Sequence, residues 1–238
     1  MIGNCVRRCL SLGKASRMCS TGAKELQLQA LNEKCFLVTP EDKIIGTASK
    51  KECHLVQKDG NIPLHRAFSV FLFNTQGQLL LQKRTPEKIT YPSHFTNSCC
   101  SHPIADVPGE DEEENNMGIL RAAQRRLNYE LGISVDQIPI QNFNYLTRIH
   151  YKDPGNGLWG EHEIDYVLFL QADVKMVPNP SEISQISFVP RDSIDEHVKV
   201  LEPLTPWFRL IYQTRLKLWW DNLDNLEKFK DHENILKL

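Results

Sequence analysis

Three histidines and two glutamates in this sequence are of the types that hold a divalent metal ion. His54 and His65 stand eleven residues apart, His102 ends the run Cys-Cys-Ser-His, and Glu161 and Glu163 flank a single residue. In an extended chain, side chains two residues apart point to the same face, so Glu161 and Glu163 can act together. Imidazole and carboxylate donors suit six-coordinate Mg²⁺ or Mn²⁺, or a borderline ion such as Zn²⁺. Each residue alone is more often a solvated or hydrogen-bonded side chain, so the set is a hypothesis about a site.

Cys100 is the strongest candidate for a reactive thiol, because it lies two residues before His102 and can share its face of the chain. The alternative is that Cys100, like its neighbour Cys99, is a small buried hydrophobic residue. The chain has 7 cysteines in all, and no spacing among them is typical of a disulfide framework or a zinc knuckle. This pattern indicates free thiols and a reducing compartment.

Short apolar runs separated by turn residues predict the strands that must position these groups. The runs at 67–73 and 79–82 are joined by a loop containing Gly77, which predicts a β-hairpin. The other expected strands, each bounded by turn residues, are 35–38, 143–151, 164–170 and 186–189.

Two helices complete the expected domain. The segment 118–131 has helix composition and ends at Gly132, a typical C-cap residue. The segment 206–229 predicts a long amphipathic C-terminal helix, because apolar residues are available for one face. Strands and helices in this order predict an α+β, or mixed α/β, domain with a mixed β-sheet flanked by helices.

Composition and charge exclude several classes of protein. The sequence has 28 basic and 30 acidic side chains and a net charge of -2, whereas proteins that bind nucleic acids or membrane surfaces usually carry a basic excess. No apolar run approaches the roughly 18 residues that span a bilayer. We therefore expect no nucleic-acid or membrane partner. A small-molecule substrate and a monomer are expected as well, although composition does not derive either of them.

The first 24 residues differ from the rest of the chain. They contain five basic residues and no acidic residue, which resembles a mitochondrial transit peptide; the alternative is a disordered tail of chance composition. Residues 25–238 are expected to form a single domain. The C-terminal sequence Leu-Lys-Leu is weakly similar to the peroxisomal signal Ser-Lys-Leu. The expected location is intracellular, in the cytoplasm or the mitochondrion, with the peroxisome as a further alternative.

The tail of the first expected helix is similar to the end of a Nudix box. Glu130 occupies the last glutamate position of that motif, but Met117, Arg126 and Tyr129 stand where its other three glutamates belong. A Nudix hydrolase uses those carboxylates to hold divalent cations against a diphosphate. The sequence therefore predicts a Nudix-like scaffold that lacks the hydrolytic metal site.

Several separate motifs together resemble those of type I isopentenyl-diphosphate isomerases, a family with a Nudix-like fold and a degenerate box. The element Thr-Asn followed by Cys-x-His is found at 96–102, and the element Glu-x-Glu at 161–163. The phrases HRAFSVF at 65–71 and TPWF at 205–208 match as well. The resemblance covers the chain from about Cys35 to the C-terminus, and the motifs agree in order and spacing.

The resemblance implies a role for each matching residue. Cys100 and Glu163 would be the catalytic pair, and Tyr151 would assist the glutamate. Trp207 would lie over the reacting carbons, and Glu130 would help to hold a second Mg²⁺ bound to the substrate diphosphate. The first metal would be bound by His54, His65, His102, Glu161 and Glu163, and the diphosphate by Lys50, Arg84, Lys88, Ser101 and Arg126.

The implied reaction interconverts isopentenyl diphosphate and dimethylallyl diphosphate, a step of isoprenoid and sterol biosynthesis. Protonating an alkene produces a tertiary carbocation, so the site must offer an acid on one face and a base on the other. Which of Cys100 and Glu163 protonates first stays open. One rival hypothesis is a Nudix-type diphosphate hydrolase, which the three missing glutamates disfavour. The other is a noncatalytic binding module, which would have no need for Cys100, His102 and Glu163 together.

Overall fold

Strand β3 (His65–Phe73) is the centre of a mixed sheet, and all nine of its residues are buried. The computed structural model describes residues 15–238, with side chains from residue 22 onward. Along its length β3 pairs in parallel with β8 (Glu161–Gln171), and on its other edge it pairs antiparallel with the short strand β6 (Cys99–Ser101). A strand covered on both faces takes a continuous apolar sequence, which explains why the run at 67–73 does not alternate with polar residues.

The remaining strands extend the sheet on both sides of β3. The main path runs β10-β7-β8-β3-β1-β2, while β4 leaves β3 to pair with β5 and β9. The bounds are β1 (Lys34–Val38), β2 (Ile44–Ser49), β4 (Leu79–Arg84), β5 (Phe95–Thr96), β7 (Asn144–Asp153), β9 (Ile183–Val189) and β10 (Ile235–Lys237).

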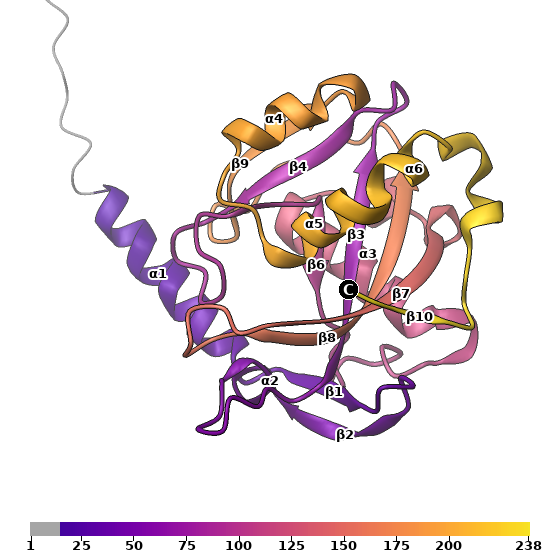
Figure 1. Cartoon of the computed structure of the whole chain (residues 1–238). Coiled ribbons are helices and arrows are strands. Elements are labelled where there is room, and N and C mark those ends of the chain that lie inside the picture. Colours follow the sequence, from indigo (N-terminus) through magenta and orange to yellow (C-terminus); the bar gives the residue numbers. More distant parts are fainter. Residues whose placement is uncertain (1–14) are drawn as a thin grey trace, which may run out of the picture.

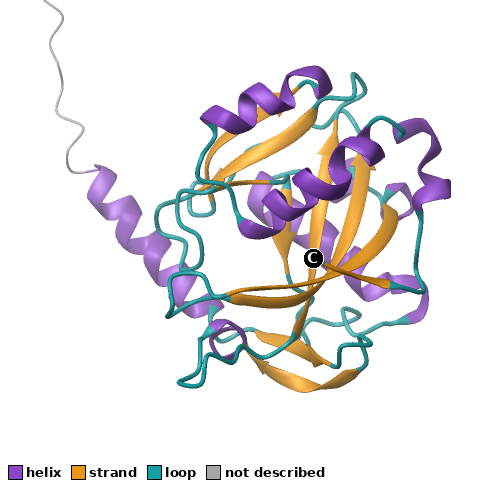
Figure 2. Cartoon of the chain, in the orientation of Figure 1, coloured by secondary structure: helices purple, strands orange, loops and turns teal. Residues whose placement is uncertain are grey.

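Helices cover both faces of this sheet, as Figures 1 and 2 show. Alternate residues of β3 point to opposite sides, as the two-residue period of a strand requires. Val70 and Leu72 pack in a core with helix α3 (Met117–Leu131), whereas Phe71 and Phe73 pack in a second core with helices α5 (Pro206–Ile211) and α6 (Lys217–Trp220). The two cores hold the ends of β3, β6 and β8 in fixed positions between them.

Three further helices lie at the edges of the sheet: α1 (Ala15–Ala30), α2 (Lys50–His54) and α4 (Ile194–Val200). The end of α1 lies beside the start of α2, because the backbone N–H groups of Lys50 and Lys51 donate to the carbonyls of Glu33 and Leu31. Of the N-terminal segment 1–24, residues 1–14 lie outside the described residues, and residues 15–24 belong to α1 (Figure 1). The transit peptide stays a prediction.

The expected strands and the first helix are confirmed, with ends that differ by a few residues. Gly132 caps α3 with a φ of 65°, and a Cβ there would lie 2.3 Å from the carbonyl oxygen of Val177. The predicted hairpin is only partly right, because β3 and β4 pair at Phe73 and Leu79 alone. Along the rest of that edge, β6 occupies the position beside β3 that a full hairpin would give to β4.

The prediction of one long helix at 206–229 is wrong in its extent. The helical segment runs through α5, a π-helical turn at Tyr212–Leu216 and α6, and it ends at Asp221. A separate 3₁₀ segment, Leu223–Phe229, follows. Asp221 and Asn222 lie between the two, and such side chains compete with helical backbone hydrogen bonds. Within the described part of the chain, no helix combines the length and apolar character needed to cross a membrane.

Candidate active site

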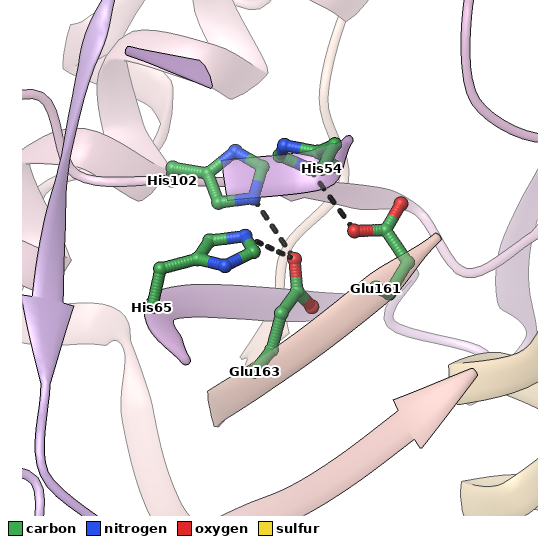
Figure 3. A group of neighbouring side chains, drawn as sticks. All are labelled: His54, His65, His102, Glu161 and Glu163. Carbon is green, nitrogen blue, oxygen red and sulfur yellow. Dashed lines mark hydrogen bonds and ion pairs between the residues drawn. The ribbon is translucent and has the colours of Figure 1, made fainter. Parts of the chain in front are cut away.

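The five residues expected to bind the first metal come together at one end of β3, as Figure 3 shows. His54 ends helix α2, whose start is fixed by a capping box between Ser49 and Glu52. The other four come from strand ends that meet at the same place: His65 begins β3, His102 follows β6, and Glu161 and Glu163 begin β8. The parallel register places His65 directly opposite Glu163.

The cluster is tight and buried. All five donor atoms lie within 4.8 Å of one another. His54 Nε2 is 3.0 Å from Glu161 Oε2, while Glu163 Oε1 is 2.9 Å from His102 Nε2 and 3.4 Å from His65 Nε2 (Figure 3). Each of the five residues is at most 6% exposed. Three imidazoles and two carboxylates thus face one small volume that water barely reaches.

The hydrogen bonds around the imidazoles prepare two of them as ligands. His54 Nδ1 lies 2.7 Å from the carbonyl oxygen of Lys50, and His65 Nδ1 lies 3.0 Å from that of Pro63. A carbonyl oxygen accepts, so Nδ1 carries the proton and a neutral ring presents the Nε2 lone pair to the cluster. His65 Nε2 and Glu161 Oε2 are buried and lack a well-formed hydrogen bond. Buried polar atoms rarely stay unsatisfied, and a divalent cation among them would satisfy these two.

The carboxylates and imidazoles of the cluster shift one another's pKa values in opposite directions. Burial, reinforced by the charge of Glu163, raises the pKa of Glu161 well above its usual range. Burial opposes the ionisation of Glu163, but His102 and His65 hold its pKa well below the usual range. Burial lowers the pKa of His54 to about 3, whereas the carboxylate of Glu163 overcomes burial and raises the pKa of His65 to about 9. These opposed shifts mark a site that lacks a permanent positive charge.

The expected catalytic pair lies beside this cluster. Cys100, on β6, and Glu163 line the same pocket. Tyr151, on β7, donates its hydroxyl to Glu163 Oε2 at 2.5 Å, so the two oxygens of this carboxylate have different partners. Burial raises the pKa of the Cys100 thiol to about 12, although Arg84 opposes the rise. Cys99 points the other way, into the core shared with α3.

Trp207 closes one side of the pocket. Thr205 and Pro206 start α5, and Pro206 stands in the first turn where its missing N–H costs nothing. The indole N–H of Trp207 donates to Asn97 Oδ1 at 3.1 Å, and the ring of Tyr91 meets it edge-on at 5.3 Å between centroids. The indole is therefore held in one orientation while it lines the pocket.

The residues expected to hold the diphosphate line the same pocket: Lys50, Arg84, Lys88, Ser101 and Arg126. The guanidinium of Arg84 forms most of its hydrogen bonds within the protein. Its Nε and Nη2 donate to the backbone carbonyls of Tyr91 and Thr90, at 3.1 and 2.8 Å. Its Nη1 lies 4.0 Å from the sulfur of Cys100. Arg84 therefore fixes the neighbouring loop and offers one nitrogen, rather than a fork, to the pocket.

Glu130 lies behind these cations instead of in the pocket lining. Its Oε1 accepts from Arg126 Nη2 at 2.5 Å, and its Oε2 accepts from the side chain of Gln82 at 3.1 Å. Glu182, which sequence reasoning missed, accepts from both Lys88 and Arg126. A lone glutamate before a strand is usually solvated, so no sequence signal distinguishes it.

Comparisons with known proteins agree with this geometry. The model of the NUDIX domain family matches residues 63–208. Isopentenyl-diphosphate Delta-isomerase 1 of Mus musculus is 50% identical over 218 residues, covering 90% of this chain and 96% of that protein. The protein of the same name from Bos taurus is 48% identical over 220 residues, with the same coverage. The chain belongs to the isopentenyl-diphosphate isomerase family.

The family extends to more distant organisms and the fold extends further. Isopentenyl-diphosphate delta-isomerase IDI1 of Gibberella zeae is 46% identical over 224 residues, covering 92% of this chain and 88% of that protein. Among solved structures, DR0079 from Deinococcus radiodurans has a TM-score of 0.54 and 19% identity, covering 77% of this chain and 99% of that chain. That second likeness shows a shared fold, whereas the curated relatives show isomerase family membership.

Membership in the isomerase family and the degenerate box lead to the same view of α3. The helix keeps the scaffold position of a Nudix box, but Arg126 and Glu130 satisfy each other as an i, i+4 ion pair. Met117 begins the helix and Tyr129 is 40% exposed, so neither position adds a carboxylate to the pocket. In this isomerase family member, the cluster of five donors from α2, β3, β8 and the residue after β6 is the part of the described chain best suited to a metal.

Proposed function

We propose that this chain interconverts isopentenyl diphosphate and dimethylallyl diphosphate, with Cys100 and Glu163 as the two groups that transfer protons. The main observation in support is that a thiol and a carboxylate line one pocket. The cluster of three histidines and two glutamates lies on one side of this pair, and a set of basic side chains lies on the other. Curated relatives named isopentenyl-diphosphate isomerases support the reaction.

The two groups divide the proton transfer between them. In the substrate-free site, burial keeps Cys100 a neutral thiol, while two imidazoles favour the ionised form of Glu163. Moving the double bond requires one proton to be added to the terminal carbon and another to be removed two carbons away. Because the reaction is reversible, each group donates a proton in one direction and accepts one in the other. Tyr151 orients the Glu163 carboxyl through its hydroxyl.

We propose that His54, His65, His102, Glu161 and Glu163 hold a divalent ion. Mg²⁺, Mn²⁺ and Zn²⁺ all accept nitrogen and oxygen donors of this kind. Such an ion, when bound, would supply a permanent positive charge and make the Glu163 carboxyl a stronger acid. A second Mg²⁺ would accompany the substrate diphosphate, with Glu130 nearby behind Arg126.

Trp207 and the basic residues serve the two halves of the substrate. A tertiary carbocation needs stabilisation without a nucleophile that would trap it, and the face of an indole provides about 1–2 kcal/mol when water is excluded. Lys50, Arg84, Lys88, Ser101 and Arg126 line the pocket and can donate to the diphosphate. Binding at the diphosphate thus fixes the reacting carbons against Trp207.

A direct assay distinguishes this proposal from hydrolysis. The protein is incubated with isopentenyl diphosphate in D₂O with a divalent ion, and the products are followed by proton NMR. We expect dimethylallyl diphosphate, deuterium exchange at the carbons that gain protons, and no release of phosphate. Phosphate release without movement of the double bond would support the hydrolase instead. The monomeric state and the cellular location remain predictions.

A further inference from the structure

A buried carboxylate that the proposed reaction does not use lies between two of the basic residues of the pocket. Glu182, just before β9, is 4% exposed. Its Oε2 accepts from Lys88 Nζ and lies 3.3 Å from Arg126 Nη2. Its Oε1 accepts from the side chain of Gln27, on α1, at 2.8 Å. One carboxylate therefore ties together a loop, helix α3 and helix α1.

The contacts of Glu182 use only part of the donor capacity of the two cations. A lysine ammonium has three N–H donors and an arginine guanidinium has five. Glu182 takes one donor of Lys88, and Arg126 directs its Nε and Nη2 to Glu130 and Glu182. Arg126 Nη1 forms no hydrogen bond within the described residues, and both cations line the pocket. Their remaining N–H groups are available to an anion there.

We propose that Glu182 is a positioning residue, which holds Lys88 and Arg126 in the arrangement that binds the substrate diphosphate. The inference rests on the proposed function, since it takes the diphosphate as the ligand of these cations. Long basic side chains lose considerable rotamer freedom when they bind, and fixing them in advance removes that cost from binding. Glu182 also offsets the repulsion between two cations held close together in a buried place.

A simple count of charges predicts the opposite effect, which makes the proposal easy to overturn. Without Glu182 the pocket would be more positive, and an anion would bind more tightly if charge alone decided. However, burial already lowers the pKa of Lys88, and the negative charge of Glu182 opposes this lowering more strongly than any other group does. Loss of Glu182 would thus loosen both cations and weaken the charge of one.

The test is steady-state kinetics of the full chain with isopentenyl diphosphate and saturating Mg²⁺. In Glu182→Gln we expect KM to rise about tenfold, which corresponds to the loss of about one charged hydrogen bond. We expect kcat to change by less than about twofold. KM should change more than kcat because the diphosphate is not altered in the reaction. The protein therefore binds it equally well in the ground state and in the transition state. Calorimetric binding of inorganic pyrophosphate should weaken by the same factor. An unchanged or lower KM in Glu182→Gln would overturn the proposal.

Three further variants separate positioning from other effects. Asp173→Asn removes a carboxylate from an exposed loop and controls for net charge, so its KM should match the parent. Glu182→Asp keeps the charge on a shorter side chain and should recover part of the lost affinity. It also provides the test if Glu182→Gln does not fold. If Glu182→Asp raised KM as much as Glu182→Gln does, this result would count against a role for the charge.

A double-mutant comparison then shows whether Glu182 acts through the cation. In an Arg126→Ala background, Glu182→Gln should raise KM by less than about threefold, because one of its two targets is gone. An effect of equal size in both backgrounds would place Glu182 in the general fold and overturn the proposal. If Arg126→Ala alone leaves KM unchanged, the proposed diphosphate site itself fails. A raised KM in Arg126→Ala with an unchanged KM in Glu182→Gln refutes only the present inference.

Discussion

The pocket has two buried charged regions that are built on opposite principles. At one end, the carboxylates of the cluster of three histidines and two glutamates contact titratable imidazoles and the hydroxyl of Tyr151, and two donor atoms of the cluster lack well-formed hydrogen bonds. At the other end, Lys88, Glu182, Arg126 and Glu130 alternate in sign and satisfy one another. The first region could take up an added cation, whereas the second is held in place by its own ion pairs before any ligand binds and keeps further N–H donors for an anion.

The ionisation of the carboxylates follows this difference. Burial raises the pKa of Glu161 in the first region, since no permanent cation among the described residues forms an ion pair with it. In the second region, Lys88 and Arg126 overcome the effect of burial and lower the pKa of Glu182 to about 2. Equal burial thus gives opposite results for Glu161 and Glu182, because permanent cations contact the second carboxylate and a titratable imidazole contacts the first. We expect metal to control the first region, and side-chain geometry the second.

The largest effect is expected from Cys100, the thiol that lies next to the cluster of three histidines and two glutamates. Cys100→Ala should lower kcat by about 10³-fold or more, because a proton-transfer group is removed, while inorganic pyrophosphate still binds with nearly the parent affinity. Cys99→Ala is the matched control, since its side chain lies in the core on the opposite face. Kinetics and calorimetry on both variants check this. A dead Cys99→Ala and an active Cys100→Ala would show that the assignment is wrong by one residue.

A second large effect is expected from two of the proposed metal ligands, Glu161 and Glu163. Glu161→Gln should lose bound metal and activity together, and Glu163→Gln should lose at least as much activity because it also transfers a proton. Metal content is measured by elemental analysis next to kcat. Asp165→Asn is the matched control: this carboxylate continues the same face of β8, bonded to Ser69, but contributes no donor to the cluster, so metal should be retained. Full metal content in Glu161→Gln would remove this residue from the site.

A smaller effect is expected over the reacting carbons. Trp207→Leu should lower kcat by about tenfold, the equivalent of the 1–2 kcal/mol that an aromatic face gives a desolvated cation. Trp207→Phe keeps an aromatic face and should lose less. Thermal unfolding of both variants controls for the loss of packing in the core around α5. Equal activity of the Leu and Phe variants would contradict stabilisation of a carbocation by the ring.

The smallest effect on the chemical step is expected in the second region. Arg126→Ala should raise KM by about tenfold and leave kcat within a small factor, because the diphosphate is bound equally before and during the reaction. Arg126→Glu should weaken binding further without creating hydrolase activity, since Met117 and Tyr129 still supply no carboxylate. Steady-state kinetics and phosphate release check both variants. An unchanged KM in Arg126→Ala would mean that this cation does not bind the substrate.

The two regions also differ in how far the sequence predicts them. Most residues of the first region, the cluster of three histidines and two glutamates, stand in recognisable motifs. The two-residue period of an extended strand correctly placed Glu161 and Glu163 on one face. Glu182 does not belong to any such motif, because its partners Lys88 and Gln27 are 94 and 155 residues away along the chain. Tertiary structure alone makes this glutamate a buried ion-pair partner.

The same limit explains the other differences. The pattern of apolar runs, turn residues and helix-forming residues located the core strands and α3, because burial decides most of those residues. It did not reveal that the guanidinium of Arg84 is largely taken by the carbonyls of Thr90 and Tyr91, since backbone acceptors have no sequence signature. Nor did it predict the end of the C-terminal helical segment at Asp221, where polar side chains compete with the backbone.

Removal and return of metal test the central claim most directly. The protein is stripped with a strong chelator, and conversion of isopentenyl diphosphate to dimethylallyl diphosphate is measured before and after a divalent ion is added back. We expect activity to disappear on stripping, to return when the ion is restored to the parent, and to stay absent in Glu161→Gln. Full isomerase activity in the exhaustively stripped parent would contradict the account.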